Sequence, residues 1–148
     1  MSGAPELVVF VGLQGAGKST HYFRHFAATH AHVSKDRMRN NRNRERRQRE
    51  LVEGALREGR SVVVDNTNPS PEVRAPLLAI GRAHGAHVVA LWFDVPFALC
   101  EERNRRRAGR ARVPDVALHV TRAQLVPPTL DEGFDEIRVV RTAGGDRL

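Results

Sequence analysis

The chain has 148 residues, of which 41% are hydrophobic and 28% are charged, a composition typical of one globular domain with its own core. No apolar stretch approaches the roughly 20 residues needed to cross a bilayer, and residues 1–6 lack the pattern of a secretory signal. The single cysteine, Cys100, excludes an internal disulfide and a Cys-based zinc site. We therefore expect one cytoplasmic domain over residues 1–148, without a membrane span.

Charge is distributed unevenly along the chain. The sequence holds 24 Lys and Arg against 17 Asp and Glu, a formal net charge of +7. The excess gathers in two arginine-rich blocks, residues 37–49 and residues 101–112. Such blocks suit a polyanionic partner, because contacts to phosphate dominate nucleic-acid affinity. Two solvated, arginine-rich helix faces would give the same pattern, so charge alone leaves both interpretations open.

The predicted elements alternate between short apolar strands and longer amphipathic helices. Strands are expected at residues 7–11, 31–34, 61–65, 87–93 and 137–141. Helices are expected at residues 19–29, 37–58, 71–84, 96–107 and 114–124. Continuous apolar strands separated by helices favour an α/β fold, in which helices sandwich a parallel sheet of about five strands.

Residues 39–50 contain no apolar side chain. A helix without an apolar stripe cannot pack into a core, so this segment is a solvated helix, a disordered stretch or a phosphate-binding surface. We expect the helix to dock only from about Leu51 onward, through Leu51, Ala55 and Leu56.

The segment Gly12–Ser19 (GLQGAGKS) fits the P-loop pattern GxxxxGK[ST] and lies between a predicted strand and a predicted helix. In such a loop, backbone N–H groups point at phosphate oxygens and the helix N-terminus adds positive charge. Lys18 is expected to reach the β and γ phosphates, the Ser19 hydroxyl to ligate Mg²⁺, and Thr20 to bond a phosphate near the α position. The predicted nucleotide-binding residues of this loop are Gly12, Gln14, Gly15, Ala16, Gly17, Lys18, Ser19 and Thr20.

Two acids follow predicted strands at the edge where α/β sheets bind ligands. Asp65 ends the strand SVVVD and is a candidate second acid beside the metal; the alternative is that it caps the turn at residues 66–69. Asp36 follows the second strand and is a candidate proton acceptor for an attacking hydroxyl. Asp36 is equally suited to cap the predicted long helix, and one residue can do both.

Residues 101–114 are predicted to form the end of a helix, a glycine-containing turn and the start of another helix. Nucleotide kinases use an arginine-rich lid of this kind to offset charge on the transferred phosphoryl group. Arg103 and Arg107 are four residues apart and share a helix face. The structural alternative is a solvated basic helix end, stabilised by the helix dipole.

Four segments together resemble the kinase domain of polynucleotide 5′-kinases. They are residues 12–20 (GLQGAGKST), 33–37 (VSKDR), 64–69 (VDNTNP) and 126–137 (VPPTLDEGFDEI). The likeness extends over about residues 7–141. A P-loop is common to many ATPases, whereas the pairing of DNTNP with PPTLDEGF is much more specific.

This resemblance implies a P-loop phosphotransferase that uses ATP or other NTPs with Mg²⁺ to phosphorylate 5′-OH ends of DNA or RNA, as in end healing and repair. It makes Asp36 the general base and places Arg103 and Arg107 on the donor phosphates. Lys18, Asp36, Arg103 and Arg107 would form the catalytic set, and Ser19 and Asp65 would hold the metal. The acceptor would contact Asp36, Arg39, Asp65, Asn66, Thr67 and Asn68.

The resemblance also implies that residues 129–134 lie beside the nucleotide-base pocket. Lys35 and Gln14 stand where the family more often has arginine and proline, and neither change should remove the reaction. Arg105 or Arg106 could substitute for Arg103 or Arg107. We expect no accompanying phosphatase or ligase module within these 148 residues.

Two other functions stay open at this point. A gluconate- or shikimate-like kinase of the same fold shares the P-loop and the lid, but has no need of an arginine-rich segment without apolar residues. A nucleic-acid-binding module with a regulatory nucleotide site would bind oligonucleotides without transferring phosphate.

Overall fold

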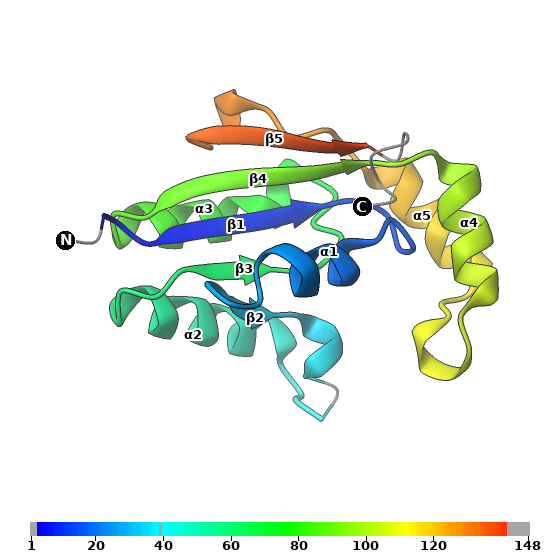
Figure 1. The fold of residues 1–148 in the computed structure, drawn as a ribbon, viewed down its shortest axis with the longest axis horizontal. Helices are drawn as coiled ribbons and strands as arrows, with labels where there is room; N and C mark the ends of the chain where they lie inside the picture. The colour runs from blue at the N-terminus through cyan, green and yellow to red at the C-terminus, as the bar shows by residue number, and fades with distance from the viewer. Residues whose placement is uncertain (1–2, 39, 142–148) are drawn as a thin grey trace.

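A computed structural model describes residues 3–38 and 40–141, and it contains the predicted five-stranded parallel sheet. The strands are β1 (Glu6–Val11), β2 (Ala31–Val33), β3 (Val62–Val64), β4 (His87–Asp94) and β5 (Glu136–Arg141). They lie in the order β2-β3-β1-β4-β5 (Figure 1), so β1 is the central strand. All four pairings are parallel, which confirms the predicted α/β fold class.

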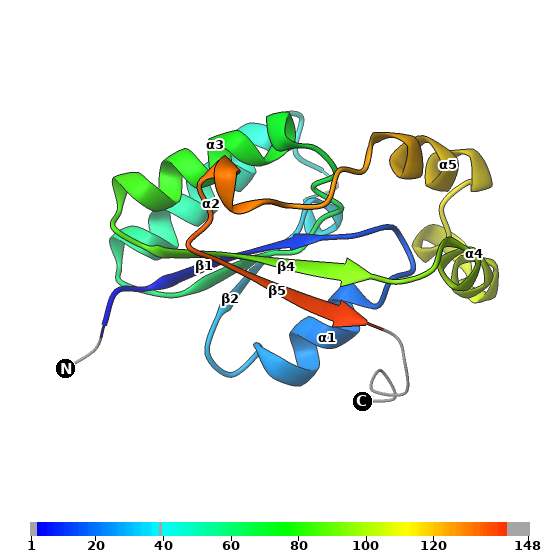
Figure 2. The same ribbon diagram turned by 90° about the horizontal axis from the view of Figure 1, so that it is seen from above.

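Helices cover both faces of the sheet (Figure 2). The α-helices are α1 (Lys18–His25), α2 (Arg44–Arg57), α3 (Pro71–Ala83), α4 (Phe97–Arg106) and α5 (Asp115–Gln124). Three short 3₁₀ helices are η1 (Lys35–Arg37), η2 (Gly109–Ala111) and η3 (Leu130–Glu132). The helices α2 and α3 lie on one face and α1 on the other, while α4 and α5 stand beyond the carboxyl ends of β1 and β4. None of the described helices is long and apolar enough to cross a membrane.

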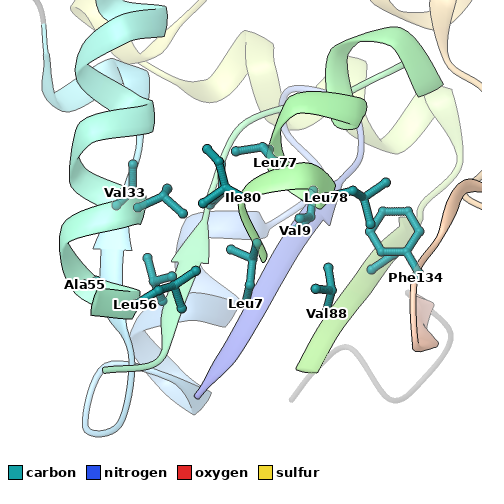
Figure 3. Packing of buried hydrophobic residues seen from close by; sticks show 14 of the residues in the cluster. Leu7, Val9, Val33, Ala55, Leu56, Leu77, Leu78, Ile80, Val88 and Phe134 are labelled. Atoms are coloured by element: carbon teal, nitrogen blue, oxygen red, sulfur yellow. The ribbon is translucent and has the colours of Figure 1, made fainter. Parts of the chain in front are cut away.

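The central strand β1 is buried on both faces because its successive apolar side chains point in opposite directions. Leu7, Val9 and Val11 pack with α2 and α3 in one cluster, which Figure 3 shows from close by. Val8 and Phe10 pack in a second cluster with residues of α1, α4 and α5. The P-loop therefore begins directly after a strand whose side chains are anchored in two cores.

The helix predicted over residues 37–58 is wrong at its N-terminal end. The chain forms η1, turns, and begins α2 only at Arg44. The Asn43 side chain caps α2 by accepting a hydrogen bond from the Arg46 N–H at 3.0 Å, and Met38 is buried before the turn. Asparagine favours caps and turns over helix interiors, so the run at residues 40–43 was the signal for this break.

Docking of α2 starts earlier than expected. Gln48, not Leu51, is its first buried residue, and the Gln48 Oε1 accepts a hydrogen bond from Asn66 Nδ2 at 2.7 Å. Helix α1 is shorter than predicted and ends at His25. A hydrogen bond from the Tyr22 hydroxyl to the His30 carbonyl holds the turn that follows α1.

A fully buried arginine joins two distant segments. Arg74 in α3 donates from Nη1 to the carbonyls of Asn68 (2.9 Å) and Val126 (3.0 Å). It also makes a bidentate pair with Glu132, with both N···O distances at 2.8 Å. Arg74 thus ties the loop after β3 to the segment before β5, and the sequence analysis did not single it out.

Replacing Arg74 by Met should destabilise the fold by about 3–5 kcal/mol, because Glu132 would keep a nearly buried charge without its partner. Urea denaturation measures this change in the free energy of unfolding. Arg82→Met is the matched control, because Arg82 lies on the same helix and donates to the Gly133 carbonyl while exposed. It should cost less than about 1 kcal/mol. Similar losses in the two variants would contradict the role of Arg74.

Candidate active site

Three strand ends meet at one edge of the sheet. Val9 of β1 pairs with Val64 of β3, and Val64 pairs with Val33 of β2, so the three strands are level. Gly12, Asp65 and Ser34 follow these strands directly or nearly so. The P-loop, Asp65 and the segment with Asp36 therefore lie together at the carboxyl edge, where open α/β sheets bind ligands.

Lys18 closes the P-loop on itself. Its Nζ donates to the carbonyl oxygens of Gly12 (2.9 Å) and Leu13 (2.7 Å), and its side chain is buried. Burial lowers the pKa of the Lys18 ammonium to about 8, and the Asp65 carboxylate opposes this shift. Arg107 lowers the pKa further and Asp36 raises it, so both groups lie within electrostatic reach of Lys18.

Gly15 allows the P-loop to pack directly on α4. Its φ is +83°, a left-handed conformation that favours glycine. A Cβ at this position would stand 2.5 Å from the Cys100 carbonyl oxygen, which is too close for any side chain. Cys100 itself is a buried core residue, and burial raises the pKa of its thiol.

Asp65 faces the P-loop rather than its own turn. Its Oδ2 accepts hydrogen bonds from the Ser19 hydroxyl and from His32 Nε2, both at 2.8 Å. The carboxylate is buried, and within residues 3–38 and 40–141 it accepts no hydrogen bond from the turn at residues 66–69. The capping alternative for Asp65 therefore has no support, whereas the pairing with Ser19 agrees with the expected metal site.

His32 is the partner of Asp65 that the sequence analysis missed. The strand register explains the pairing, because His32 in β2 and Asp65 after β3 lie on neighbouring strands near the same edge.

Asp36 lies in η1 with an exposed carboxylate, for which the described residues supply neither a hydrogen bond nor an ion pair. Ser34 caps η1 by accepting from the Asp36 N–H at 3.3 Å. Because α2 begins at Arg44 and is capped by Asn43, Asp36 does not cap that helix. The carboxylate is therefore available to a ligand. Arg39, the expected acceptor contact, lies outside the described residues.

The loop after β3 braces the segments on either side of it. Asn66 Oδ1 accepts from the Lys35 N–H at 2.9 Å, which fixes the start of η1. The Thr67 carbonyl accepts from the Gly12 N–H at 3.1 Å. Asn68, in a left-handed conformation with φ 42°, donates from Nδ2 to the Phe10 carbonyl at 2.7 Å. These three residues were expected to contact the acceptor, and their contacts in the structure hold the edge of the site together.

The arginines in α4 and directly after it divide into two sets. Arg103 and Arg107 line a cavity beside the P-loop, and Arg103 Nη1 lies 3.4 Å from the Gly15 carbonyl oxygen. Arg105 and Arg106 lie outside that lining and pair along the helix with acids at 3.5 and 2.8 Å. The geometry therefore favours Arg103 and Arg107 over their neighbours as the lid arginines.

Buried Asn104 shapes the lid. Its amide donates to the Val113 carbonyl at 2.8 Å and accepts from the Val113 N–H at 3.0 Å, which closes the turn between α4 and α5. Gln14 ties the P-loop to α5 by donating from Nε2 to the Thr121 hydroxyl at 3.0 Å.

The cavity beside the P-loop has a volume of about 340 Å³. Gly15, Gly17, Thr20, Arg24, Arg103 and Arg107 are among its lining residues. Residues 129–134, which were expected beside the base pocket, contribute nothing to this lining. They pack against α3 instead, because Glu132 pairs with Arg74 and Phe134 is buried in the cluster formed by α2 and α3.

The residues at this edge fit a magnesium ion better than a transition metal. Within the described part of the chain, no three His, Cys, Asp or Glu side chains gather as a metal cluster. Mg²⁺ keeps several waters and commonly takes one or two protein oxygens together with substrate phosphates. The adjacent Ser19 hydroxyl and Asp65 carboxylate match that requirement.

Sheet order, P-loop and lid together define a P-loop kinase fold. A family model described as an AAA domain matches residues 7–128, and the chain belongs to that family. A protein of Acanthamoeba polyphaga mimivirus described as a bifunctional polynucleotide phosphatase/kinase is 29% identical over 142 residues. The bifunctional polynucleotide phosphatase/kinase of Schizosaccharomyces pombe is 26% identical over 141 residues. Each alignment covers 91% of this chain, which spans about a third (33%) of each relative.

Solved structures share this fold. Kti12 of Chaetomium thermophilum, in complex with ADP-AlF₃, has a TM-score of 0.73 at 15% identity and covers 93% of this chain and 89% of its own. A fungal RNA kinase also has a TM-score of 0.73 at 15% identity, over 94% of this chain and 38% of its own. A gluconokinase of Sinorhizobium meliloti 1021 has a TM-score of 0.65 at 19% identity, over 94% and 83%.

The lowered pKa of Lys18 predicts that nucleotide binding takes up protons. Phosphates should raise the pKa of Lys18 in the complex. At a pH between about 8 and this higher pKa, the free protein lacks a proton that the complex holds. Affinity for ADP should fall by at least about tenfold from about pH 7.5 to about pH 9.5. Calorimetry in buffers of different ionisation enthalpy measures the uptake.

Lys18→Arg is the control, because arginine stays protonated throughout this range. The Cys100 thiol has a raised pKa, so it should stay protonated in the lower part of this pH range. Equal proton uptake in wild type and Lys18→Arg would contradict the assignment to Lys18.

Proposed function

We propose that this chain is a kinase domain that transfers the γ-phosphate of ATP, or of another NTP, to 5′-hydroxyl ends of DNA or RNA. The observation that carries the proposal is the exposed Asp36 carboxylate, which has no hydrogen-bond or ion-pair partner among the described residues and lies at the same sheet edge as the P-loop. The similarity to two polynucleotide phosphatase/kinases supports a polynucleotide acceptor. We propose that residues 1–148 act as one such domain in the repair of nucleic-acid ends.

The proposed mechanism gives each of these residues one role. Asp36 accepts the proton of the attacking 5′-hydroxyl, and Lys18 binds oxygens of the terminal phosphate. Arg103 and Arg107 offset the charge that spreads over the transferred group. Ser19, and Asp65 through water, would hold Mg²⁺, which neutralises phosphate charge when bound.

In this proposal, a basic surface of the protein beside Asp36 binds the acceptor strand. Exposed arginines cluster around the start of α2, and the Lys35–Glu45 ion pair links that helix to η1. Arg46 and Arg47 share Glu50 at 3.4 and 3.5 Å and stay largely exposed, so they can exchange this weak pairing for phosphate contacts. This arrangement favours a strand-binding surface over the solvated-helix interpretation of residues 37–49.

Asp36→Asn should lower the rate of 5′ phosphorylation by about 100-fold or more, because the amide cannot accept the hydroxyl proton. Labelling of 5′-OH DNA and RNA oligonucleotides with MgATP measures this rate. Calorimetric affinity for ADP should stay close to wild type, since Asp36 does not line the cavity beside the P-loop. Near-normal turnover of the variant would show that another group is the base.

Changing Arg42, Arg44, Arg46 and Arg47 to Gln should raise KM for a long oligonucleotide far more than KM for ATP, because backbone contacts to the strand are lost. The control changes Arg57, the last residue of α2, and Arg60, just beyond the helix, and should leave both values close to wild type. Wild-type KM for the oligonucleotide should also rise steeply with salt. A gluconate- or shikimate-like kinase would show equal effects on both substrates and little salt dependence.

A further inference from the structure

A buried histidine stands behind the acid of the proposed metal site. The His32 side chain is only 7% exposed, and its Nε2 lies 2.8 Å from Asp65 Oδ2. One face of the imidazole stacks on Tyr22, with ring centroids 4.0 Å apart and an angle of 14° between the planes. The mechanism described above does not use this residue.

The neighbours of His32 determine which ring nitrogen carries the proton. Arg37 Nη1 lies 3.1 Å from Nδ1, and a guanidinium group can only donate hydrogen bonds. Nδ1 must therefore accept, which leaves the proton on Nε2. The Nε2–H then donates to Asp65 Oδ2. His32 thus links Arg37 to the carboxylate and holds the carboxylate in one orientation.

Asp65 is consequently held in an asymmetric way. Its Oδ2 takes donors from both Ser19 and His32, whereas Oδ1 has no hydrogen-bond donor among the residues that the structure describes. Two donors on one oxygen, from different elements, resist rotation of the carboxylate about its Cβ–Cγ bond. Ser19 alone would leave that rotation open, and Ser19 is itself an expected metal ligand.

We propose that His32 is a positioning residue for Asp65: it fixes the carboxylate plane so that Oδ1 is available to the water shell of the metal. This inference rests on the proposed phosphoryl transfer, because that reaction requires the metal. Groups that orient the ligands of a metal typically change metal affinity or activity by about 10- to 100-fold when they are lost.

The chain supplies a close variant and a matched control. His32→Phe keeps a ring on Tyr22 and removes the hydrogen bond, while His32→Gln restores an N–H donor of similar reach. His30 offers the same chemistry away from the site, since its Nε2 lies 2.8 Å from Glu6 Oε1 and its side chain is 11% exposed. His30→Phe therefore controls for loss of a buried histidine–carboxylate pair.

The direct readout is the affinity of Mn²⁺ for the protein–ADP complex, measured by electron paramagnetic resonance without any acceptor. His32→Phe should weaken Mn²⁺ binding by about tenfold or more, His32→Gln should recover most of that loss, and His30→Phe should match wild type. ADP affinity without metal should stay within about twofold of wild type in all variants, because His32 does not line the P-loop cavity.

Wild-type Mn²⁺ affinity in His32→Phe would overturn the proposal. Equal losses in His32→Phe and His32→Gln, or a parallel loss of metal-free ADP binding, would also overturn it by showing a purely structural role. Because these measurements need no acceptor, failure of 5′ phosphorylation with intact Mn²⁺ effects would refute the proposed function and leave the role of His32 standing.

Discussion

The site depends on the register of three parallel strands. Neighbouring parallel strands that pair at matching residues finish at the same edge of the sheet. Val33, Val64 and Val9 are level across β2, β3 and β1. The residues that follow them are a hydroxyl cap, a carboxylate and a glycine-rich loop. Gly12 and Ser34 are 22 residues apart in the sequence and Ser34 and Asp65 are 31 apart, yet the sheet brings all three to one place.

The loop after β3 is the physical centre of the site. Thr67 binds the P-loop through Gly12, Asn66 binds η1 through the Lys35 N–H, and Arg74 ties Asn68 to Glu132. Each of the other three segments that carry the family resemblance is thus joined to residues 64–69. This bonding explains why DNTNP and PPTLDEGF are informative as a pair: the arginine of α3 needs an acceptor from both.

Sequence reasoning succeeded where one local rule decided the outcome. Apolar runs located all five strands, and the P-loop pattern located a nucleotide-binding loop whose lysine is buried in the structure. It failed where tertiary contacts compete with helix periodicity. The late start of α2 depends on the burial of Met38 and on the Asn43 cap, and the continuous run of polar, arginine-rich residues concealed it.

The residues missed at the site are those whose role depends on a partner far along the chain. His32 acts on Asp65, Arg74 on Glu132 and Asn104 on Val113. In a single sequence each of them looks like an ordinary polar residue on a strand or helix. The contact of residues 129–134 with α3 was hidden for the same reason, because it depends on the pairing of Glu132 with Arg74.

The most direct test is a crystal structure of the protein with Mg²⁺, a non-hydrolysable ATP analogue and a 5′-hydroxyl oligonucleotide. The account predicts that the Asp36 carboxylate accepts a hydrogen bond from the 5′-hydroxyl, in line with the γ-phosphorus, while Lys18 contacts the terminal phosphate. A 5′-hydroxyl bound away from Asp36, with another group in place to take its proton, would contradict it.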